Sequence, residues 1–171
     1  GAKATLGKLT GLESIDNFNM IDGNEFSADK AYKDSKLCNI LFGLELNHRL
    51  KFKNILIPVI AWAPGLVISR SRDGFFRYSR KYNPLGQILF ASLARDFLRI
   101  TTSNERAGML LIQLISEPKY DQSGFKYYSN KIRSPGNFIF EKTNISDEAK
   151  REGLACKLWE LSESLIKKKL K

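Results

Sequence analysis

The chain has 171 residues, of which 43% are hydrophobic and 11% are aromatic, and its formal net charge is +10. This composition is typical of one globular domain and excludes a disordered chain. The positive charge requires a nucleic-acid partner to be considered, but the cations are spread along the sequence without a binding motif, so we expect no nucleic acid. The two cysteines and the single histidine have no metal-ligand spacing, and no apolar run is long enough to span a bilayer.

Residues 1–29 are rich in Gly, Asn, Asp and Lys and show weak periodicity. Three glycines interrupt the segment, and Asp22-Gly23 is typical of a turn. We expect a loop with at most one short helix or strand.

Residues 29–50 are predicted to form a long helix. Asp29 is suited to the N-cap position, and no Gly or Pro follows until Gly43. A broad apolar face predicts a mostly buried helix that packs on a sheet. Its members are Leu37, Ile40, Leu41, Phe42 and Leu44.

Tyr32 and Lys36 are four residues apart on this helix. Four residues give about 400° of turn and about 6 Å of rise, so the two side chains share one face. An ammonium beside a tyrosine hydroxyl favours the phenolate and lowers the tyrosine pKa, which would allow proton transfer near neutral pH. Any Lys-rich helix can also contain such a pair by chance, as exposed polar residues.

Residues 54–63 form a continuous apolar run that predicts a buried parallel strand. Pro58 cannot donate a ladder hydrogen bond, so we expect the ladder to start near Val59. The run leads into Pro-Gly-Leu-Val-Ile-Ser at positions 64–69. Ligands of open α/β sheets bind beyond the carboxyl ends of strands, and Gly65 would let the backbone approach such a ligand closely.

Residues 70–82 carry five cations against one acidic residue, with aromatic residues interleaved. Three interpretations remain open: a solvated loop, a lid over an acidic and flat aromatic substrate, or a contact with anionic lipid.

The remaining elements follow from periodicity and turn residues. Residues 84–99 predict an amphipathic helix with Leu85, Ile88, Leu89, Leu93 and Phe97 on one side. Thr102 and Glu105 form a capping-box pattern for a helix over residues 103–116. Its expected core residues are Ala107, Leu110, Leu111, Leu114 and Ile115.

The carboxyl-terminal part predicts a last strand at 123–128, an irregular segment at 130–144 with a turn at 134–136, and a final helix to about residue 168. Ser146 is expected to cap this helix, and the lysines at 167–169 suit its negative end.

Residues 30–39 read Lys-Ala-Tyr-Lys-Asp-Ser-Lys-Leu-Cys-Asn. This run resembles the catalytic helix of short-chain dehydrogenases/reductases and, in its fuller form, that of light-dependent protochlorophyllide oxidoreductases. Residues 64–69 resemble the Pro-Gly-x-Val-x-Thr turn of the superfamily. Residues 4–9 with 20–23, and residues 157–162, resemble the protochlorophyllide oxidoreductase family before the catalytic helix and at the carboxyl terminus.

The resemblance implies an α/β fold, the carboxyl-terminal part of a Rossmann-type doubly wound parallel sheet. The chain lacks a Gly-rich turn at a strand-to-helix junction, so we expect the amino-terminal dinucleotide-binding half to be missing and the chain alone to be an inactive fragment. One partial domain over 1–171 would then comprise, in order, an insertion loop (1–29), the catalytic helix (29–50), the strand and Pro-Gly turn (54–69), a substrate-covering segment (70–116), and the last strand and helix (123–171).

The activity implied by the resemblance is NADPH-dependent reduction of the ring D double bond of protochlorophyllide, a tetrapyrrole, to chlorophyllide. Tyr32 would donate the proton, and Lys36 would lower the Tyr32 pKa and hold the nicotinamide ribose. The remaining implied contacts are Pro64, Gly65, Val67 and Ser69 with the nicotinamide, and Cys38, Leu66, Phe75 and Tyr78 with the substrate. The resemblance also implies a location in the cytoplasm or at thylakoid or plastid membranes, and it leaves peripheral membrane contact and oligomerisation open.

Two alternatives remain. Protochlorophyllide oxidoreductases usually have Cys where this chain has Leu66, and that difference favours a light-independent short-chain dehydrogenase of the retinol-dehydrogenase type. A core role for Cys38 is simpler than a substrate contact. The second alternative, a non-enzymatic basic binding module, would follow from the net charge.

Overall fold

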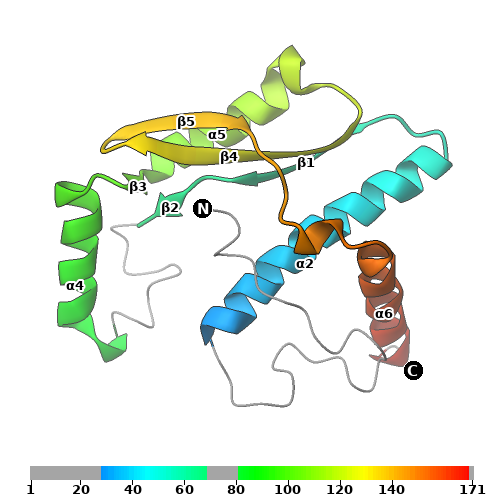
Figure 1. Ribbon diagram of the computed structural model, residues 1–171, viewed down its shortest axis with the longest axis horizontal. Coiled ribbons are helices and arrows are strands. Elements are labelled where there is room, and N and C mark those ends of the chain that lie inside the picture. The colour runs from blue at the N-terminus through cyan, green and yellow to red at the C-terminus, as the bar shows by residue number, and fades with distance from the viewer. Residues whose placement is uncertain (1–27, 69–80, 170–171) are drawn as a thin grey trace. The chain divides into compact units, whose positions relative to one another are not determined.

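The computed structural model describes residues 28–68 and 81–169 (Figure 1). Residues 1–27 of the loop expected at 1–29, and residues 70–80 of the cationic, aromatic stretch at 70–82, lie outside the described residues. The described elements, in chain order, are α2 (Ala28–Phe52), β1 (Pro58–Ala63), β2 (Leu66–Val67), α4 (Pro84–Ser92), the π-helix η1 (Leu93–Phe97), β3 (Thr101–Thr102), α5 (Asn104–Ser116), the short 3-10 helix η2 (Pro118–Tyr120), β4 (Gly124–Ser134), β5 (Asn137–Lys142), the 3-10 helix η3 (Glu148–Lys150) and α6 (Leu154–Lys169).

The described strands form two sheets. One has the order β1-β4-β5, with β4 and β5 antiparallel, and the other is the parallel pair β2-β3. This mixture of helices and a parallel-containing sheet confirms the predicted α/β class. The chain divides into two compact units: unit 1 comprises Gly1–Ala61, Gln122–Tyr127 and Asn144–Lys171, and unit 2 comprises Trp62–Asp121 and Tyr128–Thr143.

Helix α2 forms the centre of unit 1, where it packs against α6 and η3 (Figure 1). Leu37 and Leu41 are fully buried, and their neighbours in the core include Ile40 of the same helix and Leu158 of α6. The predicted helix is therefore confirmed, with its apolar residues at i, i+3 and i+4 forming the buried stripe.

Two details of the prediction for α2 are wrong. The helix begins at Ala28, so Asp29 lies inside its first turn and not at the N-cap. Phe42 is 53% exposed, because the buried stripe is narrower than the apolar pattern suggested. Its ring instead stacks on Trp159 of α6 with centroids 5.2 Å apart.

Strand β1 begins at Pro58, close to the expected start of the ladder. The prediction of a buried strand is wrong, because all six of its residues are only half-buried. β1 stands at one edge of the three described strands, and an edge strand tolerates the missing N–H of a proline at its first position.

The amphipathic helix predicted at 84–99 is divided in the structure into α4 and the π-helix η1. Asn83 caps α4, since its side-chain oxygen accepts a hydrogen bond from the Gly86 N–H at 2.9 Å. All five apolar residues predicted to share one side are more than half exposed, from 51% at Leu93 to 78% at Phe97. The apolar pattern is therefore present, but the described residues do not cover it.

Helix α5 matches its predicted range, but the predicted cap is wrong. Thr102 belongs to β3, and Ser103 is the N-cap, with its Oγ accepting from the Arg106 N–H at 3.2 Å. Leu110 and Leu114 are buried as expected. Leu111 and Ile115 are 41% and 78% exposed, so their assignment to the core is wrong.

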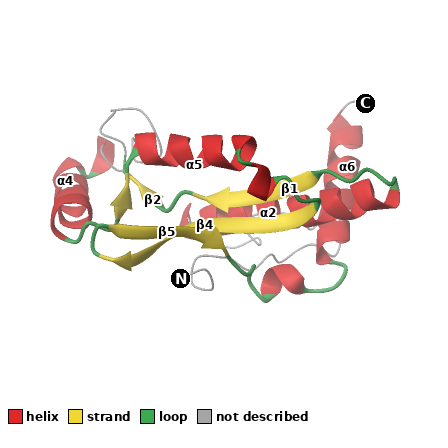
Figure 2. Cartoon of the chain, turned by 90° about the horizontal axis from the view of Figure 1, so that it is seen from above, coloured by secondary structure: helices red, strands yellow, loops and turns green. Residues whose placement is uncertain are grey.

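The segment 130–144, expected to be irregular, forms most of a β-hairpin. β4 continues to Ser134 and β5 pairs with it, so that Asn130 lies opposite Phe140 and Ile132 opposite Phe138. The predicted turn at 134–136 is confirmed as the hairpin tip, where Gly136 has a φ of +75°. Figure 2 shows α5 lying alongside this hairpin, and the Arg106 guanidinium is 6.0 Å from the Phe138 ring centroid.

The final helix begins later than predicted. The prediction that Ser146 caps it is wrong, since the Ser146 Oγ accepts from the Ala149 N–H of η3 at 3.2 Å and lies well before the start of α6. Gly153 has a φ of +74°, which is incompatible with a continuous helix, and α6 starts at Leu154. Within the described ranges, no helix is long and apolar enough to cross a membrane.

Replacing Leu41 with Ala should lower the free energy of unfolding by about 2–5 kcal/mol, because the side chain is fully buried. The matched control is Leu56→Ala at a position that is 71% exposed, where a change of about 0.5 kcal/mol or less is expected. Chemical denaturation of the complete gene product compares the two variants, and equal losses would contradict the assigned core.

Candidate functional site

Tyr32 and Lys36 lie one turn apart on the exposed side of α2. Tyr32 is 43% exposed, and the Lys36 ammonium lies over its ring, 5.3 Å from the ring centroid. The opposite side of the helix is held in the core by Leu37 and Leu41. The predicted pairing of the two side chains on one face is therefore present, and both remain accessible to a ligand.

Ser35 and Asp34, which lie between this pair in the sequence, have different surroundings. The Ser35 hydroxyl is exposed and donates to the Tyr32 backbone carbonyl at 2.7 Å, while Asp34 is 1% exposed. Cys38 is half-buried and packs against the core. Burial, and then the nearby charge of Asp34, raise the pKa of the Cys38 thiol to about 11. The thiol is thus protonated at neutral pH and is a poor nucleophile.

The Pro64-Gly65 segment forms a tight turn between β1 and β2 in unit 2. Gly65 is exposed and has a φ of +91°, a backbone conformation that residues other than glycine rarely adopt. A Cβ at this position would lie 3.1 Å from the Thr102 Oγ1 and 3.2 Å from the Asn130 carbonyl oxygen. Only a glycine therefore fits the turn, and its bare backbone faces outward.

Asn130 connects this turn to β3. Its side-chain Nδ2 donates to the Pro64 carbonyl at 3.0 Å and to the Thr102 Oγ1 at 2.9 Å. Asn130 and Thr102 are 4% and 2% exposed. The capping pattern assigned Thr102 to a helix, and nothing in the sequence singled out Asn130, because both residues are separated from the turn by long stretches of chain. Their polarity within a strand-like sequence is the one signal that could have drawn attention to them.

The other predicted site residues are distributed as follows. Leu66 and Val67 form β2 and pair with Thr101 and Thr102 of β3. Ser69, Phe75 and Tyr78 lie outside the described residues. The structure therefore brings Tyr32, Lys36 and Cys38 together on α2 of unit 1, and Pro64, Gly65, Leu66 and Val67 together at the turn of unit 2.

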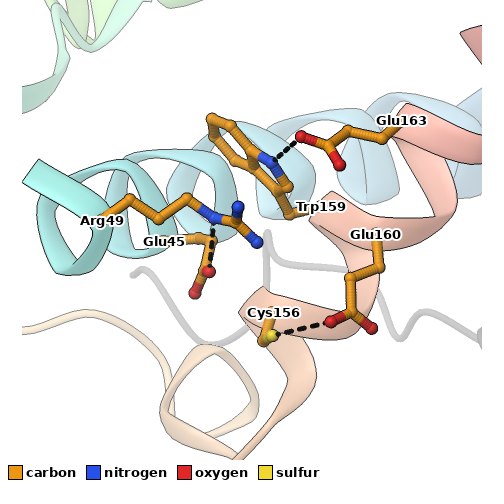
Figure 3. A network of polar contacts seen from close by, with 6 residues as sticks. All are labelled: Glu45, Arg49, Cys156, Trp159, Glu160 and Glu163. Carbon is orange, nitrogen blue, oxygen red and sulfur yellow. Dashed lines mark hydrogen bonds and ion pairs between the residues drawn. The ribbon is translucent and has the colours of Figure 1, made fainter. Parts of the chain in front are cut away.

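Polar and ring contacts also lie between α2 and α6, further along α2 than Tyr32 and Lys36 (Figure 3). The Arg49 Nε donates to the Glu45 carboxylate at 2.8 Å, and the Arg49 guanidinium lies 4.8 Å from the Trp159 ring centroid. The Trp159 indole N–H donates to Glu163 at 2.8 Å. Because the side chain of Glu45 is nearly buried, this pairing satisfies a charge that would otherwise be costly. Of these three contacts, the one between Arg49 and Trp159 joins α2 to α6.

Replacing Gly65 with Ala should destabilise the protein by about 1–3 kcal/mol, because alanine would be strained at a φ of +91° and its Cβ would crowd Thr102. Gly108 provides a control of opposite sign. It lies in helix α5 with nothing within 4 Å of an added Cβ, so Gly108→Ala should stabilise by about 0.5–1 kcal/mol. Thermal unfolding of both variants checks the pair, and a neutral Gly65→Ala would contradict the turn geometry.

Alkylation of Cys38 at pH 8 should be on the order of a hundredfold slower in the folded protein than in denaturant, since a pKa of about 11 leaves little thiolate. Mass spectrometry of the Cys38 peptide after timed exposure to iodoacetamide measures both rates. The folded rate should rise with pH up to about 11. Equal rates in the folded and unfolded states would show that the thiol is neither buried nor perturbed.

Comparison with known proteins finds similarity to protochlorophyllide reductases from several plants. The chain is 36% identical over 168 residues to the chloroplastic protochlorophyllide reductase B of Hordeum vulgare, covering 96% of this chain and 40% of that protein. It is 36% identical over 167 residues to the reductase of Cucumis sativus, covering 96% and 39%, and 35% identical over 167 residues to that of Marchantia paleacea, covering 95% and 34%. No protein-family model matches the chain.

The fold is also found in a solved structure, that of an uncharacterised protein from Mycobacterium paratuberculosis. The TM-score is 0.54 at 22% identity, over 90% of this chain and 44% of that chain. The chain spans about two fifths of the length of the curated relatives it matches. Its resemblance to protochlorophyllide reductases, which the motif at residues 30–39 predicted, is confirmed along nearly the whole of its own length.

Proposed function

We propose that this chain carries the proton-donating part and the nicotinamide-binding turn of an NADPH-dependent reductase that converts protochlorophyllide to chlorophyllide. The observation that carries the proposal is the pair Tyr32 and Lys36, exposed together on one face of α2. The similarity of 96% of the chain to protochlorophyllide reductases supports the substrate class.

Tyr32 is the proposed proton donor. Reduction of a carbon–carbon double bond adds a hydride to one carbon and a proton to the other, and a tyrosine hydroxyl can supply that proton as a general acid. The Lys36 ammonium lies over the Tyr32 ring, 5.3 Å from its centroid, and so places a positive charge next to the proposed proton donor. The same ammonium can donate hydrogen bonds to the ribose of the cofactor.

The residues at the β1–β2 turn fit a nicotinamide cofactor. Gly65 offers exposed backbone where a Cβ would fill the space, and the Asn130 Oδ1 is a buried acceptor without a hydrogen-bond partner among the described residues. NADPH would supply the hydride. Pro64, Gly65 and Val67 would hold its nicotinamide, together with Ser69 from outside the described residues.

The proposed substrate contacts are mostly apolar or aromatic side chains. Cys38 remains a protonated thiol beside the core, and together with Leu66, Phe75 and Tyr78 it would contact the flat tetrapyrrole. The relatives named above are chloroplastic, which supports a plastid location. Membrane contact and oligomerisation remain predictions.

A light-independent reductase of a carbonyl or alcohol is the second candidate, favoured by Leu66 in place of the usual Cys. The two candidates share the roles of Tyr32 and Lys36. They differ in whether light is required, and in whether the reduced bond is a carbon–carbon or a carbon–oxygen double bond.

Illumination of the complete gene product with NADPH and protochlorophyllide should give the red shift in absorption that marks chlorophyllide. Tyr32→Phe should slow this conversion by about 100-fold or more, because it removes the general acid and keeps the ring. Lys36→Met should also slow it, and should weaken NADPH binding as well.

The matched control is Tyr120→Phe. Tyr120 is buried in unit 2, and its hydroxyl interacts with the exposed Lys119, so conversion should be unchanged. Conversion that persists in Tyr32→Phe would contradict the proton-donor role. Oxidation of NADPH in the dark with a carbonyl substrate, and no photoconversion, would transfer the proposal to the second candidate.

A further inference from the structure

Asn130 is a buried polar residue in the middle of β4, and its side chain is not needed for the hairpin. Its position on the strand is already fixed by pairing with Phe140 of β5. The side-chain amide instead donates to two acceptors far away in the sequence, the Pro64 carbonyl and the Thr102 hydroxyl. A buried donor that makes two such bonds stabilises a particular arrangement, because losing it leaves both acceptors without that partner.

Both acceptors belong to the structure around the turn. Pro64 precedes Gly65, and Thr102 pairs with Val67, which follows Gly65 by two residues. The backbone of Asn130 also approaches the turn, since its carbonyl oxygen lies 3.2 Å from where a Gly65 Cβ would be. One residue of β4 therefore fixes the turn before Gly65 through its amide and limits the space at Gly65 through its backbone.

We propose that Asn130 is a positioning residue that sets the Pro64–Gly65 turn for the nicotinamide. It acts through the Pro64 carbonyl, with Thr102 orienting the amide from the β3 side. This inference rests on the proposed function, because it requires the turn to hold a nicotinamide cofactor. It adds a residue of β4 to a turn whose proposed nicotinamide contacts, Pro64, Gly65, Val67 and Ser69, all lie before position 70.

The test is Asn130→Asp in the complete gene product. Aspartate has nearly the shape of asparagine, but its carboxylate cannot donate to the Pro64 carbonyl and places a negative charge beside it. The Kd for NADPH, measured by fluorescence titration, should rise by about tenfold or more. The matched control is Asn137→Asp, the same change at an exposed position of β5, for which a change of less than about twofold is expected.

A second pair of variants separates positioning from general loss of structure. Thr102→Val keeps the shape but removes the hydroxyl that receives the Asn130 amide, so it should weaken NADPH binding at an unchanged circular dichroism spectrum. Thr102→Ser restores the hydroxyl and should restore the Kd to near the parent value. If Asn130→Asp does not fold, the two Thr102 variants test the positioning role of Asn130.

Each outcome bears on one of the two proposals. An NADPH Kd within about twofold of the parent in folded Asn130→Asp and in Thr102→Val would overturn the positioning role and leave the proposed function intact. A parent protein that binds no NADPH would overturn the proposed function and this inference with it. Weaker binding in both variants, with recovery in Thr102→Ser, supports the role.

Discussion

The burial of one stripe of α2 is the interaction on which the Tyr32–Lys36 part of the candidate site depends. Leu37 and Leu41 are fully buried against a core that includes Leu158 of α6. An α-helix that buries this stripe must expose the residues on its other side, and those residues include Tyr32 and Lys36. The chemistry of the pair therefore follows from the packing of the helix that carries it.

The turn at Gly65 depends on a different constraint. Gly65 is exposed, and its φ of +91° favours glycine. Hydrogen bonds from β4 hold it, through Asn130, at a point where β2 and β3 are only two residues long. Such short strands provide little ladder hydrogen bonding of their own, so the side-chain amide contributes a large part of what fixes the backbone there.

Much of the fold could be predicted from the sequence because local patterns determine it. The apolar spacing in α2 and α5, the Pro-Gly turn and the hairpin tip at Gly136 all depend on residues close to one another in the chain. The pairing of Tyr32 with Lys36 is equally local, since two helix residues four positions apart lie on the same face.

The predictions from the sequence are wrong where residues far apart in the chain determine the burial or the pairing of a segment. Phe42 and Ile115 fit an apolar pattern, but the described residues cover them only in part, and no local signal shows what covers a helix. The hairpin at 130–142 was missed because its strands mix polar and apolar residues and carry a weak alternation. The link from Asn130 to Pro64 joins residues 66 positions apart, and the sequence alone gives no sign of it.

The central claim is that Lys36 on α2 and the β1–β2 turn each contribute to binding of a nicotinamide cofactor. Hydrogen–deuterium exchange of the complete gene product, with and without NADPH, tests it most directly. The account predicts slower exchange on binding in peptides covering residues 30–39 and 62–67, and no change at the hairpin tip around Gly136. Protection confined to other parts of the protein, with both peptides unchanged at saturating NADPH, would contradict it.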